Sequence, residues 1–302
     1  MTKILSETTR LSNGVDMPVM GMGVWKSSNT DACNAVRAGI KHGYRLIDTA
    51  KQYGNQPGVG VGIQKALAEN NLNRKDLFIT TKVFNGDQGY QSTLDAFEEQ
   101  LKQLRLTYVD LYLIHWPVDG KYIDTWRAME KLYHEGKVRA IGISNFDEER
   151  IQDLLDHTQI MPQVNQMEFN PLVQEKDIMA KMNSIGMTME AWSPLGGGEA
   201  LSDPAVQAIA KDHGKTAAQV ILRFDYQMGV ITIPKSIHEE RLVENSQIDD
   251  FELSAAEMDQ IKALNKEKRS LWYDKFQWHT PHTDDAVSDA VDHWDDVKDF
   301  LA

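Results

Sequence analysis

The sequence contains a single cysteine, Cys33, and no long hydrophobic run. One cysteine excludes an internal disulfide and a cluster of thiolate metal ligands. No segment approaches the ~18 consecutive apolar residues of a membrane-spanning helix. The opening MTKILSETTR has too few apolar residues for a secretory signal. We therefore expect a cytoplasmic protein with no membrane partner.

Basic residues are also scarce. Lys and Arg number 32 against 45 Asp and Glu, which gives a formal net charge of −13. Affinity for a phosphate backbone comes from concentrated Lys and Arg. We therefore do not expect this protein to bind nucleic acid over a broad surface. A local basic site for one small anion remains compatible with this charge.

The 302 residues are 41% hydrophobic and 25% charged, as in ordinary globular proteins. An α/β barrel commonly uses ~250 residues as one domain. We therefore expect a single barrel domain over residues 1–302, with a hairpin at 8–19 and a C-terminal loop and short helix at 267–302.

Short apolar runs alternate with amphipathic segments along most of the chain. Asn13-Gly14 is a dipeptide favoured in two-residue hairpin turns. The apolar runs are Val19–Trp25, Leu46–Ala50, Leu77–Val83, Val109–His115, Val138–Ser144, Gln163–Phe169, Met187–Trp192 and Val230–Pro234. The helical segments are Asp31–His42, Gly58–Asn70, Gln91–Leu104, Asp124–Glu135, Glu148–His157, Glu175–Ile185, Asp203–Asp212, Thr216–Gln227 and Glu239–Ser246. Eight buried strands, each followed by helix, predict an α/β protein with a (β/α)8 TIM barrel.

An open doubly wound sheet is the alternative for this alternation. It usually carries a glycine fingerprint directly after its first strand. The run that starts at Gly21 lacks the last glycine of that fingerprint, and GVGVG at 58–62 follows a loop. The barrel is therefore favoured.

Polar residues close several of the predicted strands. Asp48, Lys82 and His115 follow three successive apolar runs, and Tyr53 stands in the loop after the first of these. An isolated charge in such a place is costly, and the C-terminal ends of the strands form the active face of a barrel. Taken singly, Asp48 and Lys82 also fit a structural ion pair, and His115 a core histidine. Together they favour a site.

At this point the sequence resembles a known family, the aldo-keto reductases, and within it the bacterial diketogluconate and glyoxal reductase branch. The resemblance runs from Asn13 to about Asn265. It rests on GYRLIDTAKQYGNQ (Gly43–Gln56), LRLTYVDLYLIHWP (Leu104–Pro117) and IPKSIHEERLVEN (Ile233–Asn245). ITTKV, GISNF and VNQMEFNP stand between them in the same order.

The resemblance implies a catalytic tetrad of Asp48, Tyr53, Lys82 and His115 that reduces aldehydes or ketones to alcohols without a metal. Carbonyl reduction needs a hydride donor and an acid for the developing alkoxide. A free tyrosine has a pKa of about 10, and a neighbouring Lys82 ammonium makes the phenol a better acid. Asp48 is expected to orient Lys82, and neutral His115 to hold the carbonyl oxygen.

The resemblance also implies NADPH as the cofactor. Ser144, Asn145 and Gln166 are expected at the nicotinamide carboxamide, Trp192 on the ring, and Ser193 and Leu195 along the pyrophosphate. The residues expected at the adenosine 2′-phosphate and the adenine are Lys235, Ser236, Arg241, Glu244 and Asn245. Taken singly, these residues also fit helix caps, core aromatics and solvated charges.

The expected substrate pocket contains Trp25, Phe84, His115, Trp116 and Trp272. The aromatic cluster of Trp272, Tyr273, Phe276 and Trp278 and an acidic helix from about Asp284 follow the barrel. The cluster is predicted either to form a wall of the pocket or to seal the barrel flank. The expected partner is a small carbonyl compound, and the chain is expected to be a monomer or a weak homo-oligomer. A nucleotide-binding barrel that acts as a regulatory or structural subunit is the alternative function.

Overall fold

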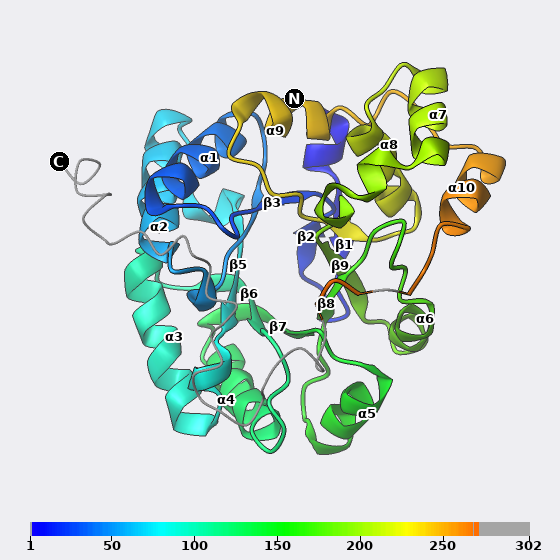
Figure 1. Cartoon of the computed structure of the whole chain (residues 1–302). Coiled ribbons are helices and arrows are strands. Elements are labelled where there is room, and N and C mark those ends of the chain that lie inside the picture. Colours follow the sequence, from blue (N-terminus) through cyan, green and yellow to red (C-terminus); the bar gives the residue numbers. More distant parts are fainter. Residues whose placement is uncertain (1, 268, 272–302) are drawn as a thin grey trace.

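The computed structural model of the protein describes residues 2–267 and 269–271. Its main sheet has eight parallel strands in the order β3 to β10 (Figure 1). Bridges from Met20 to Thr232 and from Gly23 to Lys235 join the first strand region to the last. The strands are β3 (Gly21–Gly23), β4 (Leu46–Asp48), β5 (Phe78–Val83), β6 (Val109–Ile114), β7 (Val138–Ser144), β8 (Val164–Glu168), β9 (Thr188–Trp192) and β10 (Ile231–Thr232). The predicted (β/α)8 barrel is confirmed.

Helices surround this sheet on the outside, as Figure 1 shows. They are α1 (Asn29–Lys41), α2 (Gln56–Glu69), α3 (Tyr90–Leu104), α4 (Tyr122–His134), α5 (Glu148–His157), α6 (Lys176–Ser184), α7 (Pro204–His213), α8 (Ala217–Gln227), α9 (Glu239–Ser246) and α10 (Ala255–Lys262). Of these helices, only α10 was not predicted from the sequence. Its signal was a capping box, in which Ser254 and Glu257 satisfy each other's backbone N–H groups. None of the helices in the described residues is long and apolar enough to cross a membrane.

The predicted hairpin closes one end of the barrel. Strands β1 (Thr8–Arg10) and β2 (Asp16–Pro18) pair antiparallel. Leu11 and Met17 from this hairpin are buried in the same core as Leu46 and Phe78 of the barrel. The hairpin therefore fills the N-terminal end of the barrel, and the carboxyl ends of the strands are left for a site.

The glycines of GVGVG allow close helix packing on two sides of α2: Gly58 and Gly62 face α1, and Gly60 faces the end of α3. A Cβ at Gly58 would lie 2.1 Å from the Asn29 carbonyl oxygen, and one at Gly62 would lie 2.8 Å from that of Cys33. These contacts are too short for any side chain, so α2 approaches α1 more closely than other residues would allow. The motif serves packing between helices.

After α10 the chain returns to the carboxyl end of the barrel. The Lys266 amide donates to the Leu172 carbonyl at 2.8 Å, and the Ser270 amide donates to the Glu168 carboxylate at 2.7 Å. Arg269 forms an ion pair with the buried carboxylate of Glu175. These contacts bring Leu271 to the site. The predicted aromatic cluster from Trp272 and the acidic helix lie outside the described residues.

Candidate active site

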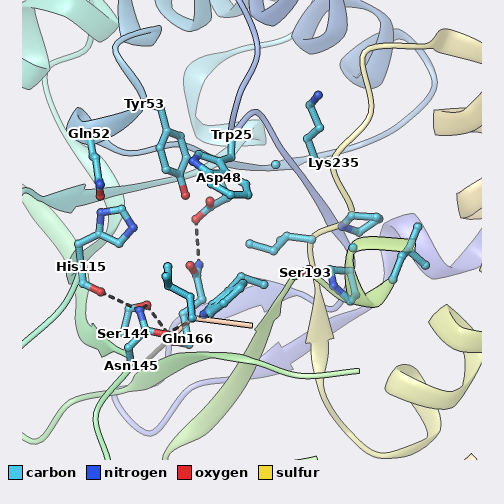
Figure 2. Close-up of a pocket in the computed structure, with 18 of the residues that line it drawn as sticks. Trp25, Asp48, Gln52, Tyr53, His115, Ser144, Asn145, Gln166, Ser193 and Lys235 are labelled. Carbon is cyan, nitrogen blue, oxygen red and sulfur yellow. Dashed lines mark hydrogen bonds between the residues drawn. The ribbon is translucent and has the colours of Figure 1, made fainter. Parts of the chain in front are cut away.

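A cavity of about 450 Å³ opens at the carboxyl ends of the strands. Figure 2 shows Asp48, Tyr53 and His115 facing the same space. Most of the predicted site residues line it: Trp25, Asp48, Tyr53, His115, Trp116, Ser144, Asn145, Gln166, Trp192, Ser193, Leu195, Lys235 and Arg241. Side chains from separate strand ends therefore converge on one place, as the barrel predicts.

Asp48, Lys82 and Tyr53 form a buried hydrogen-bonded group. The Lys82 ammonium donates to both carboxylate oxygens of Asp48, at 2.7 and 2.8 Å. It also donates to the Thr49 carbonyl at 3.1 Å and to the Tyr53 hydroxyl at 3.2 Å. Tyr53 belongs to a 3-10 turn, η2 (Lys51–Tyr53), that follows β4. The lysine lies behind the tyrosine and joins it to the carboxylate.

Burial and charge oppose each other in this group. Burial lowers the pKa of Lys82, but Asp48 and Tyr53 together raise it by more. The pKa of Lys82 therefore lies above its ordinary value. Burial raises the pKa of Tyr53 to about 12, and the Lys82 ammonium opposes this rise. The expected effect of Lys82 on Tyr53 is therefore present, but desolvation outweighs it. Tyr53 holds its proton at neutral pH.

His115 follows β6, and its ring meets the Tyr53 ring edge-on with centroids 5.8 Å apart. Burial lowers the pKa of His115 well below its ordinary value, and the Lys82 charge lowers it further. The imidazole is therefore neutral near pH 7 and keeps one N–H to donate. Its Nδ1 has no hydrogen-bond partner among the described residues.

The next strand ends present amide and hydroxyl groups. The Ser144 hydroxyl donates to the Gln166 backbone carbonyl at 2.8 Å. Asn145 donates to the His115 carbonyl at 3.0 Å and accepts from the Trp192 indole N–H at 2.8 Å. These bonds orient the amide and the indole before any ligand is present.

Backbone strain gathers around the same cavity. Asn145 and Ser193 have φ values of 64° and 51°, which non-glycine residues adopt only at some cost. Gly196, Gly197 and Gly198 follow with φ values of 58°, 60° and 98°. Gly197 and Gly198 line the cavity with backbone alone.

Lys235 and Arg241 supply positive charge to the lining of the cavity. Neither forms an ion pair with another described residue. Burial lowers the pKa of Lys235, and Asp31 opposes this shift. Ser236 does not line the cavity; its hydroxyl accepts from the His238 amide at 3.1 Å. Glu244 and Asn245 do not line it either, and Glu244 accepts from Thr216 at 2.9 Å.

The predicted substrate residues divide into three cases. Trp25, which is 41% exposed, lines the cavity together with Trp116. Gln88 donates to the Trp116 carbonyl at 2.6 Å and so holds that loop in place. Phe84 is half-buried beside the turn at Asn85–Asp87 and does not line the cavity. Trp272 lies outside the described residues.

Gln52, Leu271 and Glu190 lie at or beside the site but were not predicted from the sequence. Gln52 lines the cavity one position before Tyr53, and its side chain points toward His115 in Figure 2. Leu271 reaches the cavity from the far end of the chain. Glu190 is fully buried beside Gln166. Its signal was a charged residue inside the otherwise apolar strand TMEAW.

Comparison with known proteins agrees with this geometry. Residues 19–266 match the model of the Aldo/keto reductase family. The chain is 52% identical to a glyoxal reductase of Bacillus subtilis over 270 residues, 89% of this chain and 96% of that protein. It is 42% identical to a methylglyoxal reductase of Salmonella typhimurium over 264 residues, 86% of this chain and 94% of that protein.

A solved structure of a Bombyx mori aldo-keto reductase in complex with NADP is 32% identical to this chain, with a TM-score of 0.85. The match covers 88% of this chain and 94% of that one. Sequence, fold and site thus give the same answer: the chain belongs to the aldo/keto reductase family and is an oxidoreductase.

Proposed function

We propose that this protein reduces the carbonyl group of aldehydes and ketones to an alcohol, with NADPH as the hydride source and Tyr53 as the proton donor. The observation that carries the proposal is the Tyr53 hydroxyl, which faces the cavity beside His115 and lies 3.2 Å from the Lys82 ammonium. A phenol in contact with a buried ammonium can release its proton to an adjacent alkoxide.

The residues present fit a phosphorylated nicotinamide cofactor. No described residue donates to the side-chain carbonyl of Gln166, which lines the cavity. Neither Lys235 nor Arg241 forms an ion pair within the described part of the chain, so both charges suit a phosphate. Trp192, whose indole N–H donates to Asn145 at 2.8 Å, lines the same cavity and offers an aromatic surface to the ring. We therefore assign the carboxamide end to Ser144, Asn145 and Gln166, and the 2′-phosphate to Lys235 and Arg241.

When bound, NADPH supplies a hydride to the carbonyl carbon. The protein supplies the rest. Neutral His115 donates an N–H to the carbonyl oxygen and holds it toward Tyr53. The Tyr53 hydroxyl then gives its proton to the developing alkoxide. Lys82 stabilises the resulting tyrosinate, and Asp48 keeps Lys82 charged and in position.

A regulatory or structural nucleotide-binding subunit is the competing function. The intact group of Asp48, Lys82 and Tyr53 supports an enzyme instead. Incubation with NADPH and a panel of carbonyls, including glyoxal and methylglyoxal, tests the choice. We expect nicotinamide absorbance to fall. Tight NADPH binding with no consumption across the panel would support the subunit.

Removal of the residues after Arg269 should change substrate choice more than the chemistry. Leu271 lines the cavity, and the truncation removes it together with the sequence that follows. Full burial of one large apolar side chain is worth about 1.5–3 kcal/mol. The truncated protein should therefore show a raised KM for large apolar carbonyls and a nearly unchanged KM for methylglyoxal.

Circular dichroism of the truncated protein provides the control for folding, and Leu271→Ala reports the contribution of Leu271 alone. A folded truncated protein with unchanged kcat/KM for both sizes of substrate would show that Leu271 and the residues after it do not contribute to substrate binding.

A further inference from the structure

Glu190 is a buried carboxylate that the reaction described above does not use. It lies in the middle of β9, directly opposite Gln166 in the register of β8 and β9, and it is 0% exposed. Its Oε2 accepts a hydrogen bond from the Gln166 amide at 2.6 Å. Its Oε1 is buried and has no hydrogen-bond partner among the described residues. Such a residue is costly to bury without a function or a compensating contact.

Two carboxylates determine the orientation of the Gln166 amide. Its Nε2 donates to Glu190 and also to Asp48 Oδ2, at 2.9 Å (Figure 2 draws the bond to Asp48). The amide nitrogen has two protons, and both are used by these acceptors. A flipped amide would turn its carbonyl lone pairs toward two carboxylates. The carbonyl oxygen of Gln166 is therefore left for a donor from the cavity.

The charge of Glu190 lacks a cation in direct contact. Asp48 is paired with Lys82, whereas no described Lys, Arg or His forms an ion pair with Glu190. Burial raises the pKa of Glu190 to about 8, and the negative charge of Asp48 raises it further, against the Gln166 hydrogen bond and the Lys82 charge. The titratable groups that act on it are Asp48 on β4, Lys82 on β5 and Tyr53 on η2.

We propose that Glu190 is a positioning residue for the nicotinamide: it holds the Gln166 carbonyl toward the carboxamide N–H, and its negative charge favours the oxidised ring over the reduced one. The inference rests on the proposed function, because it requires a nicotinamide in the cavity. The oxidised ring carries a positive charge and the reduced ring carries none. Only the oxidised ring can therefore compensate the buried carboxylate.

The sign of the pH dependence follows from linkage. In the free protein Glu190 holds a proton below a pH of about 8. A positive ring lowers the pKa of Glu190, so binding of NADP+ releases a proton and strengthens as the pH rises toward 8. Binding of NADPH releases none. For a pKa shift of about one unit, the affinity for NADP+ should increase by about fourfold relative to NADPH from pH ~6.5 to ~8.

The test measures binding without any carbonyl substrate. Dissociation constants for NADP+, NADPH and 2′,5′-ADP are determined by tryptophan fluorescence or calorimetry across this pH range. In Glu190→Gln, which removes the charge and keeps the size, the NADP+ dependence should become flat. The compound 2′,5′-ADP lacks the nicotinamide and corrects for titration of the 2′-phosphate and of Lys235.

Asp225→Asn is the matched control. Asp225 is equally buried, and the only described hydrogen bond to its side chain comes from Thr232, at 3.2 Å. This variant should keep the wild-type dependence. If Asp225→Asn flattened the profile as Glu190→Gln does, or if Glu190→Gln matched the wild type at every pH, the inference would be overturned.

A second measurement tests the orientation of Gln166. The 3-acetylpyridine analogue of NADP+ carries a methyl ketone in place of the carboxamide and has no N–H to donate. At a pH of about 8, Glu190→Gln should weaken the binding of both NADP+ and the analogue, because both lose the attraction between Glu190 and a positive ring. The loss should be larger for NADP+, because only its carboxamide also loses the oriented hydrogen bond to the Gln166 carbonyl. Equal losses for both ligands would refute the orienting role.

The outcomes distinguish a failure of the role proposed for Glu190 from a failure of the proposed NADPH-dependent reduction. Failure of the wild type to bind either NADPH or 2′,5′-ADP would refute the proposed cofactor. Normal binding and carbonyl reduction with no difference in pH dependence between NADP+ and NADPH would refute only the role of Glu190. This wild-type comparison decides the question even if Glu190→Gln does not fold.

Discussion

Replacement of Tyr53 by phenylalanine should lower kcat for carbonyl reduction by about 10²–10⁴-fold, the usual contribution of general acid catalysis. The ring remains, so its edge contact with His115 is kept and only the hydroxyl beside Lys82 is lost. The affinity for NADPH should therefore change little. Steady-state kinetics with a small aldehyde, together with NADPH binding by fluorescence, measure both quantities.

Tyr112→Phe is the matched control for this loss of a hydroxyl. Tyr112 lies on β6, is fully buried, and accepts a hydrogen bond from Gln100 at 3.0 Å without lining the cavity. Its replacement should reduce stability by about 0.5–1.5 kcal/mol and leave kcat unchanged. Retention of more than about a tenth of wild-type turnover by Tyr53→Phe would show that another group is the acid.

Tyr53 is a cleaner test of catalysis than Lys82 or Asp48. Those two side chains are buried and satisfy each other through two short hydrogen bonds. Removal of one partner leaves an uncompensated buried charge, which typically costs about 3–5 kcal/mol of stability. A loss of activity in a Lys82 or Asp48 variant would therefore combine lost chemistry with lost folding.

The second large effect concerns the choice of cofactor. Lys235→Gly combined with Arg241→His should lower kcat/KM with NADPH by about 10²–10⁴-fold, because each charge-assisted contact to a phosphate is worth about 1.5–3 kcal/mol. The value with NADH should change little, since NADH has no 2′-phosphate. Parallel assays with both cofactors at one ionic strength measure the preference.

The double variant Lys121→Gly and Arg127→His is the matched control. It makes the same two substitutions, Lys to Gly and Arg to His, at α4, where neither side chain lines the cavity. It should leave the preference for NADPH intact and so exclude a bulk effect of net charge. Equal kcat/KM for NADPH and NADH in the unmodified protein would contradict the assignment of Lys235 and Arg241.

Local sequence determined most of the fold. The eight apolar runs correspond to the eight barrel strands. Parallel strands in a barrel are buried on both faces and therefore have nearly continuous hydrophobic sequences. Helix ends were predicted to within about two residues, as for α5, whose predicted and observed bounds are both Glu148–His157. The helix α10 was missed although its capping box is present, because it lies beyond the regular alternation of strands and helices.

The sequence by itself also predicts which residues carry the chemistry. Asp48, Lys82 and His115 each close an apolar strand, and the motifs around them are those of one family. That pattern is local, so it can be read along the chain. It predicts that these side chains share one end of the barrel, because the carboxyl ends of parallel strands lie together.

Only the tertiary structure decided which of these side chains touch. Gln166 and Glu190 are 24 residues apart and meet because the strand register places them opposite each other. Phe84 does not reach the cavity although it follows β5, whereas Leu271 reaches it from the end of the described chain. The balance of burial against the Lys82 charge at Tyr53 is likewise set by packing. Composition and spacing specify which groups are available, but distances and desolvation arise only once the chain is folded.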